Sequence, residues 1–173
     1  MFRCGDQVVY GIHGVCKIIE IETKRLGKQS AEYYVLQPID ESNTRYFVPT
    51  QNEAATAKLH PLLTHDELKD MLQSPQLHDD NWIEDENKRK QLYRSLITGG
   101  DRAALLRMVH ALHNRKTQQL AAGRRLHSCD ENFLRDAEKL LGAEFALVLN
   151  IDHNEVGEYV QGIIASEKAK TTL

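Results

Sequence analysis

Short runs of β-branched and aromatic residues, separated by turn residues, fill about the first fifty positions of the chain. The runs lie at residues 7–10, 15–24, 33–36 and 44–48, with glycine, proline, asparagine or aspartate between most of them. This pattern is typical of short strands joined by tight turns. Because no helical period interrupts the runs, it predicts a small antiparallel β-barrel or a curled sheet.

Two local features refine this β region. The apolar alternation changes phase between Ile18 and Ile19, which predicts a β-bulge or a strongly bent strand. Residues 25–28 are a plausible hairpin loop, with Gly27 at a position of positive φ.

After about residue 58 the apolar positions recur every three or four residues, which indicates helices. They are expected at 64–72, at 82–96, from Asp101 to a loop at 120–126, from Ser128 onward, and at 154–166, before a frayed tail at 167–173. The chain is therefore predicted to be an α+β protein of two domains. Residues 1–58 form the β domain, and residues 59–173 form an all-helical bundle of about five helices.

Three signals mark where helices should begin. Thr64 with Glu67, and Ser128 with Glu131, match the capping box, in which the two side chains satisfy each other's backbone amides. Asp101 is a favourable N-cap for the helix that follows it.

Composition indicates an ordinary globular chain. It has 173 residues, of which 41% are hydrophobic, and no apolar run approaches the ~18 residues of a membrane span. The first residues lack the apolar segment of a signal peptide. Cys4, Cys16 and Cys129 form no CxxC pair, so reduced, buried thiols are expected. These observations predict a cytoplasmic protein without membrane contact.

Charge is distributed unevenly along the chain. The net charge is −3, yet residues 88–125 contain one acid, Asp101, and ten basic residues: Lys88, Arg89, Lys90, Arg94, Arg102, Arg107, Arg115, Lys116, Arg124 and Arg125. Both flanking segments are acidic. One strongly positive segment in a near-neutral protein favours contact with a polyanion.

Metal binding and catalysis find little support in the sequence. His110, His113, His127 and Cys129 are close along the chain, but their spacing fits no zinc-finger pattern. No nucleotide-binding, hydrolase, metalloprotease or calcium-binding motif occurs. We therefore expect no metal, no cofactor and no enzymatic activity.

The basic segment could be a solvated helix face or a surface that contacts phosphates. A solvated helix face would interleave signs through pairs such as Glu86 with Lys90, whereas the near absence of acids favours phosphate contact. Trp82, the only tryptophan, precedes this segment. It either packs into a groove between domains or stays exposed and wedges against a base step of DNA.

Several segments in order along the chain resemble the CarD/CdnL group of RNA-polymerase-binding regulators. In the β half they are Gly5-Asp6-Gln7-Val8-Val9-Tyr10, His13-Gly14, Tyr33-Tyr34-Val35-Leu36 and Phe47-Val48-Pro49. In the helical half they are Trp82, Gly100-Asp101, Val109 with Leu112, and Ala137 with Leu140 and Glu144-Phe145-Ala146-Leu147.

The resemblance implies a fold and a function. The N-terminal part would be a Tudor-like RNA-polymerase-interacting domain, as found in transcription-repair coupling factors, that grips the β subunit. The helical domain would contact promoter DNA at the upstream edge of the −10 bubble, mainly through phosphates, with a tryptophan in the minor groove. The protein would then change the lifetime of the open complex without catalysis, acting as a monomer in the cytoplasm and on the nucleoid through the polymerase.

Family positions transfer residue by residue. Trp82 falls on the wedge position, and Lys24 and Arg25 fall on a charged polymerase contact. Phe47 replaces an arginine found two residues before the family proline, and Arg45 could substitute for that arginine by strand alternation.

The other residues predicted to contact DNA are basic residues of the segment 88–125: Lys88, Arg89, Lys90, Arg94, Arg124 and Arg125. The sequence departs from the family where Glu84 and Asp85 replace basic residues that usually follow the tryptophan. This departure supports an alternative, a polymerase or protein adaptor without DNA contact. A further alternative is a non-specific nucleic-acid binder that uses the basic segment alone.

Overall fold

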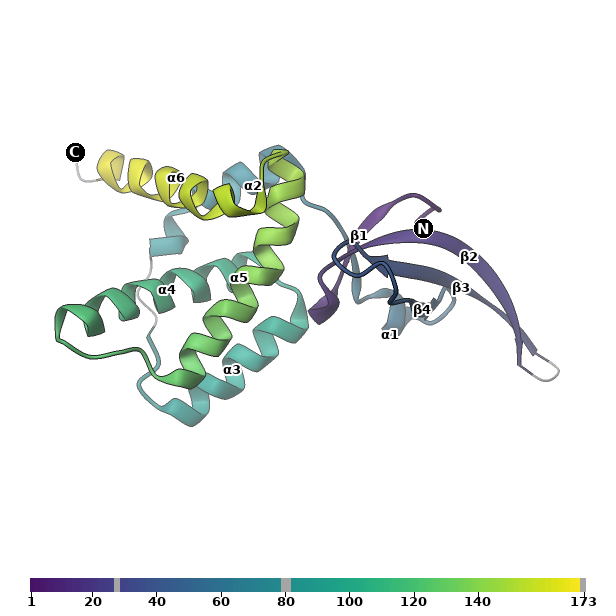
Figure 1. The fold of residues 1–173 in the computed structure, drawn as a ribbon, viewed down its shortest axis with the longest axis horizontal. Coiled ribbons are helices and arrows are strands. Elements are labelled where there is room, and N and C mark those ends of the chain that lie inside the picture. Colours follow the sequence, from purple (N-terminus) through teal and green to yellow (C-terminus); the bar gives the residue numbers. More distant parts are fainter. Residues whose placement is uncertain (27–28, 79–81, 172–173) are drawn as a thin grey trace. The chain divides into compact units, whose positions relative to one another are not determined.

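The computed structural model describes residues 1–26, 29–78 and 82–171. The chain divides into two compact units, Met1–Leu62 and Leu63–Leu173. Each has its own buried apolar cluster, as expected of units large enough to exclude water from an interior. Each is described below by itself (Figure 1).

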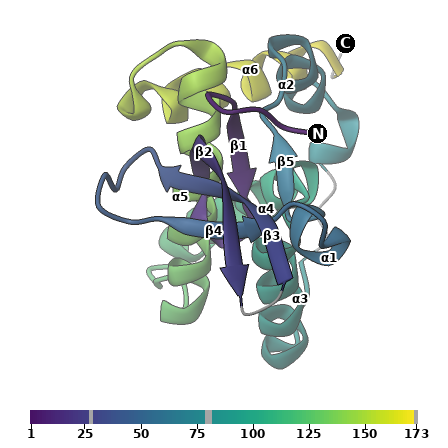
Figure 2. The same cartoon turned by 90° about the vertical axis from the view of Figure 1, so that its right-hand side faces the viewer.

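The first unit is built on one antiparallel sheet. Its strands are β1 (Gln7–Tyr10), β2 (Val15–Leu26), β3 (Gln29–Pro38), β4 (Tyr46–Pro49) and β5 (Leu59–Pro61). A short 3-10 helix, η1 (Gly11–His13), joins the first two, and α1 (Glu53–Thr56) precedes the last. The strand order is β4-β3-β2-β1-β5, and β1 and β5 lie side by side in Figure 2.

The sheet is open rather than closed into a barrel. Within the described residues β4 and β5 are its two edges and do not pair with each other. Both are short strands that end at a proline, Pro49 and Pro61. Proline cannot donate a ladder hydrogen bond, so it suits an edge and hinders closure. The predicted barrel is therefore not observed, although the antiparallel sheet is.

A β-bulge in β2 confirms the phase change in the sequence. The register with β3 shifts between Ile18 and Glu20. Ile18 pairs with Leu36 before the shift and Ile21 pairs with Tyr34 after it. The extra residue keeps both isoleucines on the sheet face that carries Leu36 and Tyr34, although they are three positions apart. The hairpin position predicted for Gly27 lies outside the described residues.

The first unit's core lies on one face of the sheet. It consists of Val8, Cys16, Ile18, Tyr34, Leu36, Val48 and Leu59. Burial raises the pKa of the Cys16 thiol to about 11, so this cysteine behaves as an inert apolar group. The prediction of buried thiols holds for Cys16 but is wrong for Cys4, which is exposed.

The sequence pattern does not indicate strand β5, because this strand has only three residues and ends in proline. Its pairing with β1 places it in the first unit, which extends to Leu62. The boundary predicted at about residue 58 precedes this strand.

The second unit is helical. Its helices are α2 (His65–Leu72), α3 (Glu86–Gly99), α4 (Arg102–Ala121), α5 (Ser128–Leu149) and α6 (Val156–Thr171), with 3-10 turns η2 (Pro75–His78) and η3 (His153–Glu155). Helix α5 contacts α2, α3, α4 and α6 and is the central element (Figure 1). Among the described residues, no helix is long and apolar enough to cross a membrane.

Two of the predicted helix starts are confirmed. Thr64 Oγ1 accepts the amide of Glu67 at 3.2 Å, and the Glu67 carboxylate accepts the amide of Thr64 at 2.7 Å. These bonds lower the pKa of Glu67. Asp101 Oδ1 accepts the amide of Ala104 at 2.9 Å and caps α4. The short-range spacing of a capping residue is therefore sufficient to locate a helix start here.

Three helix boundaries differ from the prediction. Helix α3 begins at Glu86 rather than Trp82, because Asp85 is its N-cap and accepts the amide of Lys88. Helix α5 is capped by the His127 ring, and Ser128 is its first residue rather than its cap. The predicted frayed tail is helical as far as Thr171.

A second apolar cluster fills the space between these helices. Its fully buried members include Leu68, Leu72, Leu112 and Ala137, with Phe145 at 2% exposure. Helix α5 supplies Phe133, Leu134, Ala137, Leu141 and Phe145 to this cluster. Tyr93 and Phe133 meet edge to face with ring centroids 5.7 Å apart, a favourable geometry for two aromatic rings.

One buried acid connects the start of this unit to two of its helices. Glu144 on α5 is 1% exposed. It accepts the Leu63 amide at 2.9 Å and the Arg102 Nε at 3.1 Å. Because a buried carboxylate is stable only when its oxygens are hydrogen-bonded, these contacts fix where the chain enters the helical unit.

Replacing Glu144 by alanine should lower the free energy of unfolding by about 3–5 kcal/mol, since it removes a largely buried ion pair with Arg102 and the acceptor of the Leu63 amide. Urea unfolding followed by circular dichroism measures this cost. Asp136→Ala on the same helix is the control, because Asp136 is 59% exposed and should change stability by less than about 0.5 kcal/mol. Equal effects of the two variants would contradict the role given to Glu144.

Candidate functional site

Lys24 and Phe47 form a contact on one face of the first unit's sheet. Lys24 Nζ lies 3.4 Å from the centroid of the Phe47 ring and 3.6 Å from a carboxylate oxygen of Glu22. A cation over an aromatic face is an attractive arrangement. Phe47 is still 43% exposed, so the pair presents a large apolar surface beside a positive charge.

The register of the sheet explains why these residues meet. Phe47 on β4 is opposite Val35 on β3, while Lys24 on β2 is opposite Ala31. Since side chains alternate between faces, Phe47, Val35 and Ala31 share a face, and Lys24 joins them. Residues distant in the sequence are thereby brought together on one face of the sheet.

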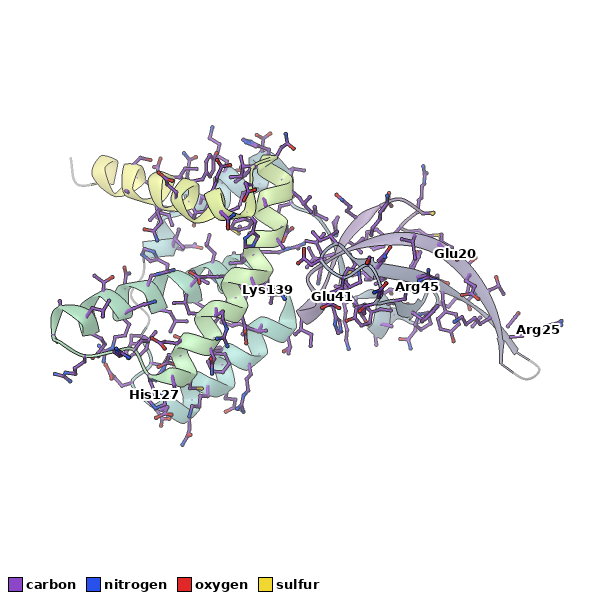
Figure 3. All side chains as sticks on the ribbon, viewed as in Figure 1. Glu20, Arg25, Glu41, Arg45, His127 and Lys139 are labelled. Atoms are coloured by element: carbon purple, nitrogen blue, oxygen red, sulfur yellow. The ribbon has the colours of Figure 1, made fainter. Side chains whose placement is uncertain are left out.

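Arg25 and Arg45 occupy different places. Arg25 is exposed near the far end of the β2–β3 hairpin (Figure 3), and strand alternation directs it to the face opposite Lys24. Arg45 is exposed immediately before β4, over the body of the sheet. The structure therefore brings Lys24 and Phe47 together, whereas Arg25 lies apart from them.

Strand β4 is also an edge of the sheet. Within the described residues it pairs with β3 alone. An edge strand has one row of backbone donors and acceptors facing outward, where a strand of another protein can pair with it. Strand β4 thus combines the exposed ring of Phe47 with a backbone edge that, within the described residues, no other strand pairs with.

In the second unit, Arg89 belongs to the interior rather than to the surface. Its side chain is 7% exposed, and its Nη2 lies 2.8 Å from Asp130 Oδ2. Its Nε donates to Asp130 Oδ1 at 3.0 Å, and its Nη1 donates to the Ile83 carbonyl at 2.7 Å. The hydrogen bond to Asp130 raises the pKa of Arg89 above its usual value, against the effect of burial. The N–H groups of Arg89 donate to Asp130 and to the Ile83 carbonyl. Arg89 is therefore not available to contact DNA.

Trp82 lies before the start of α3, outside any helix or strand. Its ring packs against the apolar cluster of the helical unit. The guanidinium carbons of Arg89 and Arg115 lie 4.4 and 4.9 Å from the ring centroid. Within the described residues its Nε1 is buried without a hydrogen-bond partner. Trp82 therefore packs within the helical unit itself, which favours a structural role over a fully exposed wedge.

An acid stands beside this tryptophan. Glu84 is 79% exposed, and one of its carboxylate oxygens lies 3.8 Å from Nη2 of Arg115. Arg115 therefore contacts both the Trp82 ring and a carboxylate. Glu84 therefore partly neutralises the positive charge of Arg115 beside Trp82, which makes this position less attractive to a phosphate.

The other basic residues fall into two groups. Arg102 is paired with Glu144, and Lys90 is paired with Glu86, as the spacing of four predicted. That hydrogen bond raises the pKa of Lys90 and lowers the pKa of Glu86. The exposed members of the predicted DNA set are Lys88, Arg94, Arg124 and Arg125. The basic segment therefore contains both side chains that form ion pairs within the unit and side chains that are exposed to solvent.

The histidines have local structural roles. His113 Nε2 lies 2.6 Å from a carboxylate oxygen of Glu138, and His127 Nδ1 accepts the amide of Cys129 at 3.3 Å. Throughout the part of the chain that the structure describes, no group of histidine, cysteine and acidic residues could hold a metal ion.

Comparison with known proteins concerns the first unit. Residues 2–61 match the family model described as CarD-like/TRCF RID domain. The resemblance inferred from the sequence is thereby confirmed for this unit, and these residues are such a domain. The match is consistent with a role in transcription. A search of curated proteins returned no match for the chain.

We expect Arg89→Ala to reduce the free energy of unfolding by about 3–5 kcal/mol, because Asp130 is left buried without its partner. Lys88→Ala, at the exposed neighbouring position, is the control and should cost less than about 0.5 kcal/mol. The double variant Arg89→Met with Asp130→Leu should recover part of the loss, since apolar groups of similar size remove the unpaired charge. Unfolding curves in urea give all three values. A stability unchanged in Arg89→Ala would contradict the internal assignment.

Trp82→Ala should reduce stability by about 3 kcal/mol, through loss of packing against the helical core and of the contacts with two guanidinium groups. Differential scanning calorimetry measures this effect. Leu120→Ala removes an apolar side chain that is 59% exposed and should leave the melting temperature nearly unchanged. If Trp82→Ala melts like the wild type, the tryptophan is available as a wedge and the packing interpretation is wrong.

Proposed function

We propose that this protein is a bacterial transcription regulator whose CarD-like/TRCF RID domain, residues 2–61, binds the β subunit of RNA polymerase. On this proposal the helical unit contacts promoter DNA near the upstream edge of the −10 bubble and alters the stability of the open complex. The protein performs no catalysis of its own and acts as a cytoplasmic monomer. The observation that carries the proposal is the domain match, which covers the unit bearing the Lys24–Phe47 surface.

Two features of the first unit support the protein contact. Phe47 is an exposed aromatic residue under a lysine, and exposed aromatic and basic residues are frequent anchors of protein interfaces. The edge of β4 offers backbone pairing to a strand of the partner. Arg45 and Arg25 then provide outlying positive charge for an acidic partner surface.

Exposed charge supports the DNA contact. Lys88 and Arg94 on α3, with Arg124 and Arg125 in the loop after α4, are accessible to phosphates. Contacts of this kind position a protein on DNA without reading its sequence. This suits a factor whose location is decided by its bound polymerase.

A second candidate is a polymerase adaptor that makes no contact with DNA. Its support is specific: Arg89 is engaged with Asp130, Trp82 is packed inside the unit, and Glu84 is exposed beside it. The two candidates share the polymerase contact and differ only in the role of the helical unit.

Reversing the charges of Lys24, Arg25 and Arg45 to glutamate should weaken retention of the polymerase β subunit by the full-length chain. Phe47→Ala alone should weaken it by about tenfold or more if the aromatic ring is the anchor. The matched control is glutamate at Arg3, Lys17 and Lys58, which are exposed elsewhere on the unit and change the net charge equally. Affinity is measured by biolayer interferometry. Equal losses in the two triple variants, or none in Phe47→Ala and the first triple variant, would contradict the assigned surface.

Lys88→Ala with Arg94→Ala should make DNA affinity less sensitive to salt. Each phosphate contact that is lost reduces the slope of log K against log salt by about 0.9 on duplex DNA. Arg135→Ala with Lys139→Ala, which removes one arginine and one lysine from exposed positions on α5, should leave the slope unchanged. Fluorescence anisotropy at several salt concentrations gives both slopes. A wild type that binds no DNA at low salt would favour the adaptor.

A further inference from the structure

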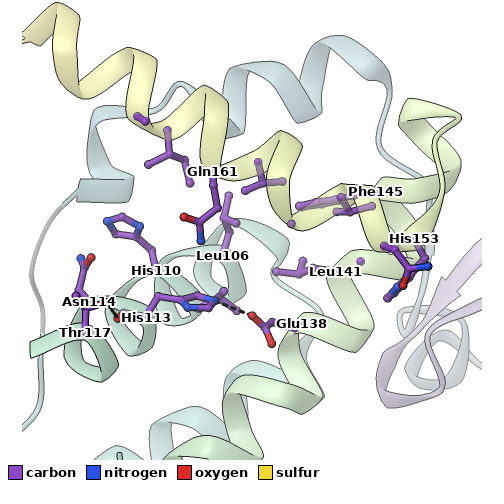
Figure 4. Close-up of a pocket in the computed structure, with 18 residues that line it drawn as sticks. Leu106, His110, His113, Asn114, Thr117, Glu138, Leu141, Phe145, His153 and Gln161 are labelled. Carbon is purple, nitrogen blue, oxygen red and sulfur yellow. Dashed lines mark hydrogen bonds and ion pairs between the residues drawn. The ribbon is translucent and has the colours of Figure 1, made fainter. Parts of the chain in front are cut away.

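A cavity in the helical unit has no part in the proposed polymerase or DNA contacts. Its volume is about 510 Å³, and it is formed by α4, α5, η3 and α6 (Figure 4). This size lies within the range of about 300–1,000 Å³ typical of small-molecule sites. All of its lining residues belong to the second unit, so the cavity is a property of that unit alone.

Apolar side chains from three helices make up much of the wall. Leu106 and Val109 come from α4, Leu141 and Phe145 from α5, and Val160 and Ile164 from α6. Such a wall favours the hydrocarbon or aromatic body of a ligand, because burying apolar surface is favourable.

Several polar side chains gather in one part of the cavity, while His153 lies at its other end (Figure 4). Figure 4 shows His113, Asn114 and Gln161 in that part, with the contact between His113 and Glu138 drawn as a dashed line. His113 Nε2 lies 2.6 Å from Glu138 Oε1. A carboxylate has about four lone-pair positions on its two oxygens, so Glu138 can accept a second donor while it keeps His113.

The described part of the lining has one acid, Glu138, and three histidines, His110, His113 and His153. Among the described lining residues there is neither lysine nor arginine. A carboxylate or phosphate group entering the cavity would meet a like charge without a fixed counter-charge. An ammonium group would meet the Glu138 carboxylate at the polar part while its apolar body contacts the wall.

We propose that this cavity binds a small amphipathic amine, with its ammonium group at Glu138 and its apolar body against Leu106, Leu141 and Phe145. The site is independent of the proposed polymerase and DNA contacts. Its failure would leave those proposals intact.

Three probes with similar apolar bodies test the chemical class: phenethylamine, phenethyl alcohol and hydrocinnamate. Binding to the full chain is measured by ligand-observed NMR titration at one fixed pH for all three probes. The expected order of affinity is amine, then alcohol, then carboxylate. No binding of the amine at millimolar concentration, or tighter binding of the carboxylate, would overturn the proposal.

Two glycines of α6 provide a matched pair of variants that locate the site. Gly157 lines the cavity and Gly162 does not, and a Cβ built on either meets no atom within 4 Å. Gly157→Leu should fill the cavity and weaken amine binding by roughly tenfold or more. Gly162→Leu should bind as the wild type does. Both substitutions replace a helical glycine by a better helix former, so both should fold.

Glu138→Gln tests the charge contact. It should weaken amine binding by about fivefold, a modest effect because Glu138 is 46% exposed and therefore screened by solvent. It should leave binding of the alcohol unchanged. Amine binding that is unaffected by both Gly157→Leu and Glu138→Gln would place the ligand elsewhere and refute the proposed site.

Discussion

The buried ion pair of Arg89 and Asp130 is the constraint on which the position of the Trp82 segment in the helical unit depends. A charge taken out of water must be paired and hydrogen-bonded, so the pair fixes α3 against α5. Arg89 also binds the carbonyl of Ile83 and lies over the Trp82 ring. The segment that carries Trp82 is thereby held to the helical core. The same interaction removes one positive charge from the surface near the N-terminal end of the basic segment.

Local sequence signals predicted much of the fold. The change of phase at Ile18 located the bulge, and the spacing of Thr64 with Glu67 located the start of α2. The signal at Ser128 failed because His127, one residue earlier, caps α5 with its ring. Local spacing shows which residues are able to cap a helix, whereas the backbone geometry decides which one does. Closure of a sheet is a long-range property that short apolar runs along the chain do not reveal.

The candidate site was less predictable than the fold, because charge along a chain does not show burial. Arg89 and Lys88 are adjacent basic residues, yet one is paired with a residue 41 positions away and the other is exposed. The resemblance nominated Lys24 and Phe47 independently, and only the strand register places them in contact. The cavity was not predictable from periodicity, since its wall is shared by three helices whose apolar residues could equally have closed a solid core.

On the proposed function, the first unit binds polymerase while the helical unit reaches promoter DNA. The sharpest test is the affinity of the end-labelled chain for polymerase alone, for forked promoter DNA alone, and for the two together. Binding should be tightest to the polymerase–DNA complex, because a tethered second contact raises effective concentration. Binding to DNA alone should be weak and salt-sensitive. Failure to bind polymerase in either state, with binding to DNA unchanged by polymerase, would refute the proposed function.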